Sequence, residues 1–291
     1  MTRLARAPRG FSMIELMIGM IILSVVGASL IRLLVDQTRF MDHQEAGRAA
    51  RSVSRSSLNR VLSDLRMVEA VGGMESAVAG GKDFTVRVPY AFGIICSATA
   101  TAATASLMPV DSAMFAAPGF SGFAWRNSAG VYTYVTAGAT LNTAGTAGNC
   151  TGPAVNTLAA FNGSPAGRVV DLGATALAPV PPVGSIVFLF RRVRYEFKAS
   201  VALPGSTGLW RTMATAPVNT EEIATPFDAT AGVRFYVLNN AVAQVAVPAP
   251  LSDARGLEFR LDGLSESTPR GKAAPIRSEL TTSIFFENRP D

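Results

Sequence analysis

The segment Arg9-Gly10-Phe11-Ser12-Met13-Ile14-Glu15 leads into an apolar run that extends from Leu16 to Ile31. A short basic leader thus ends in a glycine, and a phenylalanine begins a hydrophobic stretch of membrane length. Glu15 is the exception in this stretch. A carboxylate inside a membrane-length apolar segment costs about 2.5 to 3.5 kcal/mol, so it is expected to have a function.

The segment is suited to anchoring the chain in a membrane. The leader, residues 1–10, carries Arg3, Arg6 and Arg9 and no acid, and positive charge beside a hydrophobic segment holds that end in the cytoplasm. Residues 11–35 are roughly 25 residues, which at about 1.5 Å each cross a core about 30 Å thick. Arg32 lies near the far end, where its side chain can reach the interface. We therefore expect a single-pass anchor in the cytoplasmic membrane.

This arrangement resembles the class III signal of type IV prepilins and of the related type II secretion pseudopilins. The resemblance implies that a membrane prepilin peptidase cleaves between Gly10 and Phe11, and that the new amine of Phe11 is methylated. It also implies that Glu15 pairs with the N-terminal amine of a neighbouring subunit. A plain membrane anchor would explain the apolar length and the arginines, but not Gly10 with Glu15 five residues after it. A secretory signal has a shorter apolar core and a small-residue cleavage site.

The helical pattern continues beyond the membrane segment. Between Asp36 and Glu69 there is no proline and one glycine, Gly47. Apolar residues recur every three to five positions, which is typical of one face of a helix: Val53, Leu58, Val61, Leu62, Leu65 and Val68. We predict one helix over 11–71, roughly 90 Å long, with an amphipathic second half at 36–71 that ends before Gly72-Gly73.

Residues 72–291 form the predicted head, in which the apolar periodicity changes to two. We predict strands at 84–88 (stopped by Pro89), 168–172, 186–198, 209–213, 233–238, 257–261 and 277–286, a hairpin over 122–126 and 131–135, and a short helical turn at 220–223. Thr136 to Gly148 is rich in Ala, Gly and Thr and is expected to be a surface loop. The fold class is therefore α+β, with an antiparallel sheet laid on the second half of a long helix, as in the type IV pilin fold.

Parts of the second half are similar to PilW-like minor pilins. They are Leu62-Ser63-Asp64-Leu65-Arg66-Met67, Phe190-Arg191-Arg192-Val193-Arg194-Tyr195-Glu196, Trp210-Arg211 and Leu257-Glu258-Phe259-Arg260. The same stretches also resemble the larger minor pseudopilin of type II secretion. Partners implied by these resemblances are other major and minor pilins, packed through the N-terminal helix, the prepilin peptidase, and an inner-membrane assembly platform.

Cys96 and Cys150 are the two cysteines, and both lie in the part that would be translocated. In an oxidising compartment they are expected to form one disulfide, which would close a loop of about 55 residues and contribute about 3 to 4 kcal/mol. Two unpaired buried thiols are the alternative. A metal site is disfavoured because the sole histidine, His43, lies far away on the helix.

The composition argues against an enzyme and against a nucleic-acid binder. With one histidine and no CxxC, HExxH or phosphate-binding glycine loop, no catalytic, metal or cofactor site is expected. The formal net charge is +5, of which the leader supplies three, so residues 11–291 carry +2. Arg192 and Arg194 share a predicted strand face and form a candidate basic patch, but a solvated sheet face is the default for such a cluster.

The sequence therefore predicts a minor type IV pilin, which is processed and assembled into a pilus, or primes one, for assembly, adhesion or motility. A minor pseudopilin of a type II secretion system is the alternative within the class. A membrane-anchored binding domain that does not polymerise is the alternative from another class. The discriminating residue is Glu15, which a polymerising subunit needs and a plain anchor does not.

Overall fold

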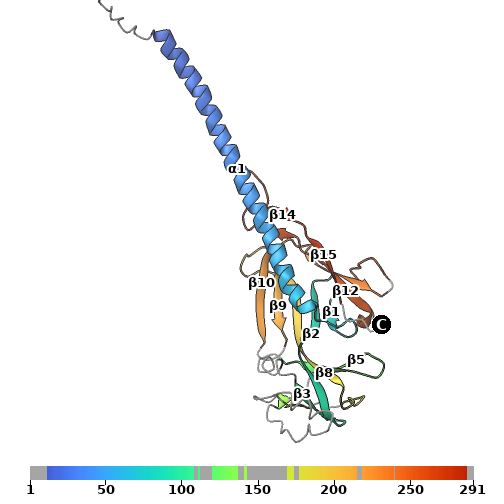
Figure 1. Cartoon of the computed structure of the whole chain (residues 1–291). Helices are drawn as coiled ribbons and strands as arrows, with labels where there is room; N and C mark the ends of the chain where they lie inside the picture. The colour runs from blue at the N-terminus through green and yellow to red at the C-terminus, as the bar shows by residue number, and fades with distance from the viewer. Residues whose placement is uncertain are drawn as a thin grey trace, which may run out of the picture.

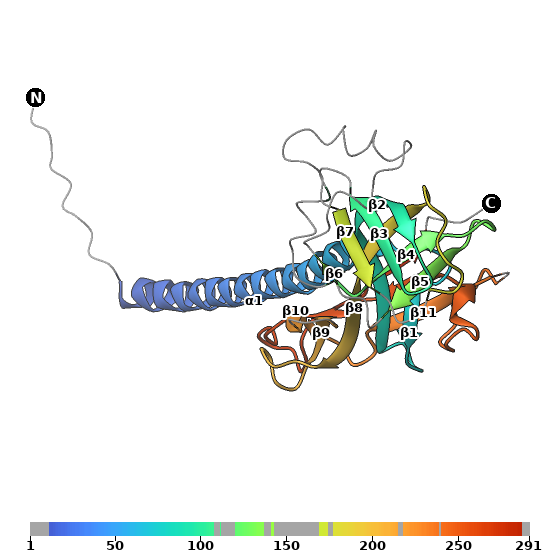
Figure 2. The same cartoon turned by 90° about the horizontal axis from the view of Figure 1, so that it is seen from below.

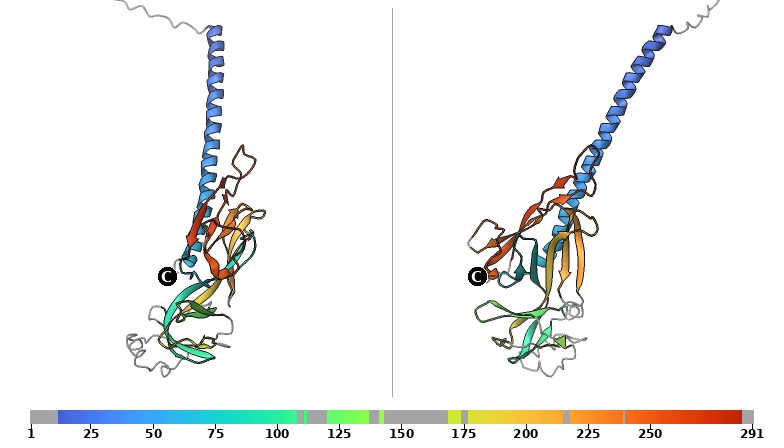
Figure 3. Two further views of the ribbon diagram at one scale, coloured as in Figure 1. Left: turned by 90° about the vertical axis from the view of Figure 1, so that its right-hand side faces the viewer. Right: turned by 180° about the vertical axis from the view of Figure 1, so that it is seen from behind.

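In a computed structural model of the protein, the described residues are 12–107, 111, 120–136, 141–142, 169–173, 177–214, 218–238 and 240–286. One long helix, α1 (Met13–Leu65), carries a β-rich head on its second half. The first half of α1 projects clear of the head in every view (Figures 1, 2 and 3). At 1.5 Å per residue, its 53 residues span about 80 Å.

The helix ends at Leu65, six residues before the predicted Val71. After the C-cap Arg66, the chain turns tightly, with Met67 N–H donating to the Asp64 carbonyl. Val68 is fully buried in the core below the helix end. Val68 has the spacing of a helical core residue, but it lies in the turn after the helix. Its spacing therefore led to a predicted helix end that was too late.

The strands are β1 (Met74–Ala77), β2 (Asp83–Ala98), β3 (Ala102–Leu107), β4 (Gly122–Arg126), β5 (Tyr132–Thr136), β6 (Leu141–Asn142), β7 (Val169–Gly173), β8 (Ile186–Ala199), β9 (Thr207–Met213), β10 (Asn219–Phe227), β11 (Gly232–Val237), β12 (Ala254–Arg260), β13 (Gly263–Leu264), β14 (Arg277–Ser278) and β15 (Thr281–Phe285). Among the described residues, they form a large sheet in the order β14-β13-β10-β9-β8-β2-β3-β7-β6 and a smaller one in the order β11-β12-β15. In the large sheet, β1 also pairs with β2, and β4 with β5 and β8. A 3-10 turn, Leu251–Asp253, precedes β12.

The antiparallel pair β2 and β8 forms the spine of the head. The prediction that Pro89 stops the first strand was wrong, because β2 continues to Ala98. The register with β8 shifts between Pro89 and Ala91. Such a bulge accommodates a residue that has no N–H to give to the ladder.

Most of the other predicted strands are confirmed, including the hairpin, which is β4 paired with β5. The helical turn predicted at Thr220–Ile223 was wrong, since these residues lie in β10, where Glu221 faces Arg211 and Glu222 faces Trp210 on β9. The predicted strand 277–286 is divided because the chain changes sheets there. Its first part, β14, pairs with β13, and its second part, β15, pairs with β12.

Two main hydrophobic cores lie along the β2–β8 spine. The first lies below α1, where Val61 and Leu65 pack with Phe84, Tyr195 and Phe259. The second is in the part of the head farther from the helix, around Trp125. The rings of Phe84 and Tyr195 stack at 5.4 Å, so α1 rests on an aromatic layer contributed by both spine strands.

Tyr90 and Arg191 lie beside the Pro89 bulge. The guanidinium of Arg191 lies 4.3 Å from the centre of the Tyr90 ring. The Tyr90 hydroxyl is buried and has no hydrogen-bond partner among the residues that the structure describes. Burial raises the pKa of Tyr90 to about 12, and the nearby charge of Arg191 opposes that rise. The phenol is therefore neutral in the folded protein well above the pH at which a free tyrosine ionises.

This difference predicts a loss of stability at alkaline pH. In the unfolded chain Tyr90 ionises near pH 10, but in the folded chain only near pH 12. Between these values the unfolded state binds fewer protons, so the free energy of unfolding falls as pH rises. We expect Tyr90→Phe, which loses no hydrogen bond, to reduce the fall between pH 9 and 12 by about 2 kcal/mol. Urea unfolding of the detergent-solubilised chain measures this, and identical pH profiles for the two proteins would contradict it.

Candidate functional site

The first turn of α1 is closed by Ser12 and Glu15. The Ser12 hydroxyl accepts from the backbone N–H groups of Ile14 and Glu15 at 3.2 and 3.5 Å. The Glu15 carboxylate accepts in return, through Oε2, from the Ser12 N–H at 3.2 Å. This capping box satisfies N–H groups that would otherwise be unpaired at the helix end. The pattern Ser12-Met13-Ile14-Glu15 signals it in the sequence, but the prediction considered only a partner on another subunit.

No residue of α1 before Ala46 is buried by the rest of the described chain. The large apolar side chains from Met13 to Val35 are between 42% and 90% exposed. Burying one such side chain is worth about 1.5 to 3 kcal/mol. An apolar surface of this length is therefore stable only when lipid or other helices cover it.

The hydroxyl side chains of Ser24, Ser29 and Thr38 are satisfied within the helix. Ser24 donates to the Ile21 carbonyl, Ser29 to the Val25 carbonyl, and Thr38 to the Leu34 carbonyl. Hydroxyls bonded in this way do not need water. Glu15 is the only charged side chain from Met13 to Ile31, which makes its carboxylate the one group here that needs a charged partner.

The second half of α1 is fixed to the head through Ser54. This residue is 1% exposed. Its hydroxyl donates to the Leu261 carbonyl at 2.9 Å and accepts from the Gly263 N–H at 3.2 Å. A Cβ added to Gly263 would lie 2.3 Å from the Ala50 carbonyl oxygen, so only glycine allows this approach. The small residues at the core face of the helix, Ala46, Ala50, Ser54 and Ser57, were the sequence signal for a close contact, and the prediction did not use it.

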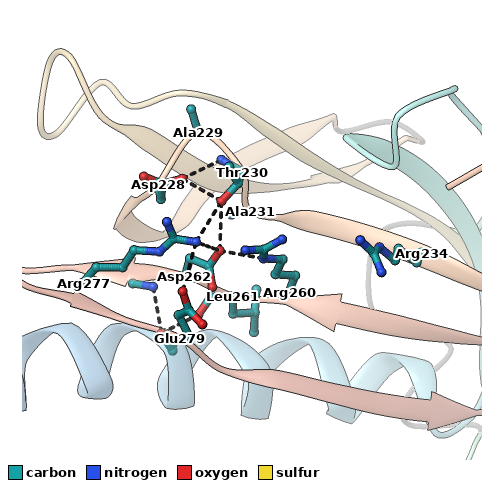
Figure 4. Close-up of polar contacts among 12 residues, drawn as sticks. Asp228, Ala229, Thr230, Ala231, Arg234, Arg260, Leu261, Asp262, Arg277 and Glu279 are labelled. Atoms are coloured by element: carbon teal, nitrogen blue, oxygen red, sulfur yellow. Dashed lines mark hydrogen bonds and ion pairs between the residues drawn. The ribbon is translucent and has the colours of Figure 1, made fainter. Parts of the chain in front are cut away.

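A buried carboxylate stabilises the loop that carries Leu261 and Gly263 (Figure 4). Asp262 is fully buried, and its Oδ2 accepts from Arg260 at 2.8 Å and Arg277 at 2.7 Å. The Thr230 hydroxyl lies 2.9 Å from the same oxygen and 2.6 Å from Asp228. Hydrogen bonds from Thr230 lower the pKa of Asp228. Because an unpaired buried charge is strongly destabilising, this cluster fixes the loop in the position that receives α1.

A second polar contact holds the end of the helix. Asp64 Oδ2 accepts from the Tyr195 hydroxyl at 2.6 Å and from Arg211 Nε at 3.0 Å. Burial raises the pKa of Tyr195, and the charge of Asp64 adds to that rise. Asp64 therefore joins α1 to β8 and β9. In the sequence, Asp64 and Arg211 stood out only because they lie in stretches that resemble pilin motifs. The contact between them was not predicted.

The predicted site residues lie far apart along the chain. Gly10, Phe11 and the leader arginines Arg3, Arg6 and Arg9 lie outside the described residues. Arg192 forms an ion pair with Glu75 at 2.5 Å, and Arg194 with Asp83 at 2.5 Å and Glu196 at 2.8 Å. These pairs reduce the positive charge that the candidate patch offers to a polyanion.

Cys96 lies in β2, whereas Cys150 lies outside the described residues, so their disulfide stays a prediction. No group of three or more His, Cys, Asp or Glu suited to a metal ion occurs in the part of the chain that the structure describes.

Comparison with protein families matches residues 6–31 to the prokaryotic N-terminal methylation motif. The chain is a type IV pilin-like protein. The motif covers the second half of the leader, the expected cleavage site, Glu15 and most of the exposed apolar helix. The helix α1 on its antiparallel sheet is the α+β pilin fold. No curated protein and no solved structure matches the chain.

The motif and the helix together assign the pilin-like protein to the inner membrane. Met13–Leu65 is the one helix among the described residues that is long and apolar enough to span a membrane. A pilin-like protein of this kind is a type IV pilin or pseudopilin substrate of prepilin peptidase, and it is a structural subunit that assembles with other pilins. Before assembly it is a single-pass protein anchored through the first half of α1.

The close contact at Gly263 predicts a specific loss of stability. We expect Gly263→Ala to lower the free energy of unfolding by about 1 to 3 kcal/mol, because the added methyl overpacks against the backbone of α1. Gly47→Ala is the matched control. No atom lies within 4 Å of the added Cβ there, so the better helix former should leave stability unchanged or raise it by up to about 1 kcal/mol. Denaturant unfolding in detergent measures both free energies. Equal effects of the two substitutions would contradict this account of the close contact between Gly263 and α1.

Proposed function

We propose that the protein is a minor type IV pilin, a structural subunit that enters a fibre or primes its assembly. Cleavage between Gly10 and Phe11, followed by methylation of Phe11, would release it for assembly. The observation that supports this most is the first half of α1. It is apolar and exposed on all sides, with a single carboxylate in its first turn.

The geometry of Glu15 suits a contact between subunits. Its Oε2 accepts from the Ser12 N–H, and none of the described residues donates to Oε1. In a water-poor bundle of helices a carboxylate requires a cation. The α-amine of Phe11 on a neighbouring, axially staggered subunit would supply it. We infer that this pair sets the register between adjacent helices in the fibre.

The size of the head supports a minor role. About 220 residues follow the helix in the sequence, and several strands of the described head lie far from α1 (Figure 1). A head of this size suits a subunit present in few copies, at a tip or in a priming complex. A disulfide between Cys96 and Cys150 would further stabilise the head in the oxidising compartment.

Glutamine at position 15 separates capping from charge pairing. Glu15→Gln keeps an oxygen that can accept from Ser12, because glutamine also completes a capping box, but it removes the charge. We expect the variant to reach the membrane and to be cleaved, with its amount in the sheared fibre fraction at least about tenfold lower. The measurement is quantitative mass spectrometry of sheared fibres against membranes.

Ser12→Ala is the matched control. It removes the cap hydroxyl, at a cost of about 1 kcal/mol, but keeps the carboxylate, so it should enter fibres at close to the wild-type level. If Glu15→Gln enters fibres as well as the wild type, the carboxylate has no role in assembly.

A further inference from the structure

The second half of α1 carries a row of exposed arginines that form no ion pair with the described part of the chain. From Ala46 to Ser63 the helix contains four arginines and no carboxylate. Arg48, Arg51 and Arg55 are exposed, and their spacing of three and four residues places them on one face. We call these three residues the basic stripe. It lies on a different face of α1 from Ala46, Ala50 and Ser54, which are buried against the head. Arg51, at its edge, also lines a hollow with Arg277 and Ser278 of β14.

The basic stripe places three arginines side by side on α1. Arg39, Arg66 and Arg126 also form no ion pair with the described residues, so what distinguishes the stripe is that its members lie together. Within the described chain, no carboxylate lies within ion-pair distance of its three members, whereas Arg60, Arg87 and Arg211 are all paired. Like charges at these spacings destabilise a helix by about 0.2 to 0.5 kcal/mol per pair. The arrangement therefore costs stability in the isolated subunit, and an acidic partner would recover it.

Short polar side chains lie between these arginines on the surface of α1. A shallow hollow of about 540 Å³ is lined by the stripe together with Ser52, Ser56 and Asn59. A carboxylate entering the hollow would meet guanidinium groups, which bind carboxylates with two parallel hydrogen bonds.

Anionic lipid does not fit the position of the stripe. Arg48 lies 13 residues beyond Val35, the expected end of the membrane segment, which is about 20 Å along the helix. Arg55 is about 30 Å away. Both distances exceed the Debye length of about 8 Å at physiological salt. A headgroup at the membrane surface therefore exerts little attraction on the stripe.

A neighbouring subunit does fit this position. The apolar half of α1 must be covered by helices that run alongside it, and such neighbours also reach the segment just beyond it. A second copy of this chain is a poor match, however. On the described head, the exposed acids are Glu266 and Glu279, and Glu279 lies 3.5 Å from Arg277. Beyond the membrane segment, α1 exposes Asp36 and Glu45 nine residues apart, while Asp42 between them is paired with Arg270.

We propose that the basic stripe binds an acidic surface on a different pilin-type subunit, adjacent in the same fibre. This inference rests on the proposed function, because it requires packing of α1 beside other helices. It makes the stripe a determinant of which subunit is the neighbour. Charge complementarity of this kind contributes mainly to specificity and to the rate of association.

A photo-crosslinking residue at Ser56 of the full-length chain, in cells that assemble the fibre, tests the proposal. We expect an adduct in the fibre fraction with a second protein that has its own prepilin-type helix, and a cross-linked peptide that contains clustered Asp or Glu. Changing Arg48, Arg51 and Arg55 together to Glu should lower the adduct yield at least about tenfold. Lysine at all three positions should largely retain it.

The control variant changes Arg126, Arg234 and Lys272 to Glu, none of which forms an ion pair with the described part of α1. It alters the net charge equally but lies on the head, so it should leave the yield unchanged. An adduct between two copies of this chain, an adduct with lipid or nucleic acid, no adduct, or a yield insensitive to the stripe would overturn the proposal. The same samples report cleavage at Phe11 and entry into fibres. A chain that is cleaved and incorporated but gives no charge-dependent adduct overturns the stripe alone, whereas an uncleaved chain absent from fibres overturns both proposals.

Discussion

The structure depends on one constraint: the two halves of a single helix must be buried in two different environments. The first half of α1 exposes apolar side chains on every side and needs lipid or other helices. The second half buries only one narrow face against the head. Since the backbone of α1 is continuous, any force on the buried membrane half is transmitted to the head through the contacts near Ala50, Ser54 and Asp64.

These contacts are polar and close, which explains how a narrow helix face holds a large head. Ser54 and Gly263 bring the backbones of helix and strand together. Asp262 with its two arginines fixes the loop, and Asp64 with Tyr195 and Arg211 holds the last turn. Apolar packing alone is less specific in direction and register than hydrogen bonds of defined geometry.

The N-terminal part of the molecule could be predicted from sequence because its signals are local. The leader, the apolar run and the position of Glu15 lie within one short segment. Helical spacing identified Val61 and Leu65 of the buried face, but not its small residues. The end of the helix was missed, because Val68 keeps helical spacing while being buried from a turn. The order of strands in the head was out of reach, since β2 pairs with β8 about one hundred residues away. Ser54 and Gly263 were missed for the same reason, because they lie some 200 residues apart in sequence. The partners of Asp262 are nearer, but Arg277 and Thr230 lie on other strands or turns, and no local pattern brings them together.

The most direct test of the central claim is mass spectrometry of the N-terminus of protein purified from its native membrane. If the chain is a pilin subunit, it begins at Phe11 with a methylated amine. Glu15 is then five residues from the new terminus, where it can pair with a neighbouring amine. A chain that keeps residues 1–10 in a cell with an active prepilin peptidase would contradict this, and would make α1 the anchor of a domain that does not polymerise.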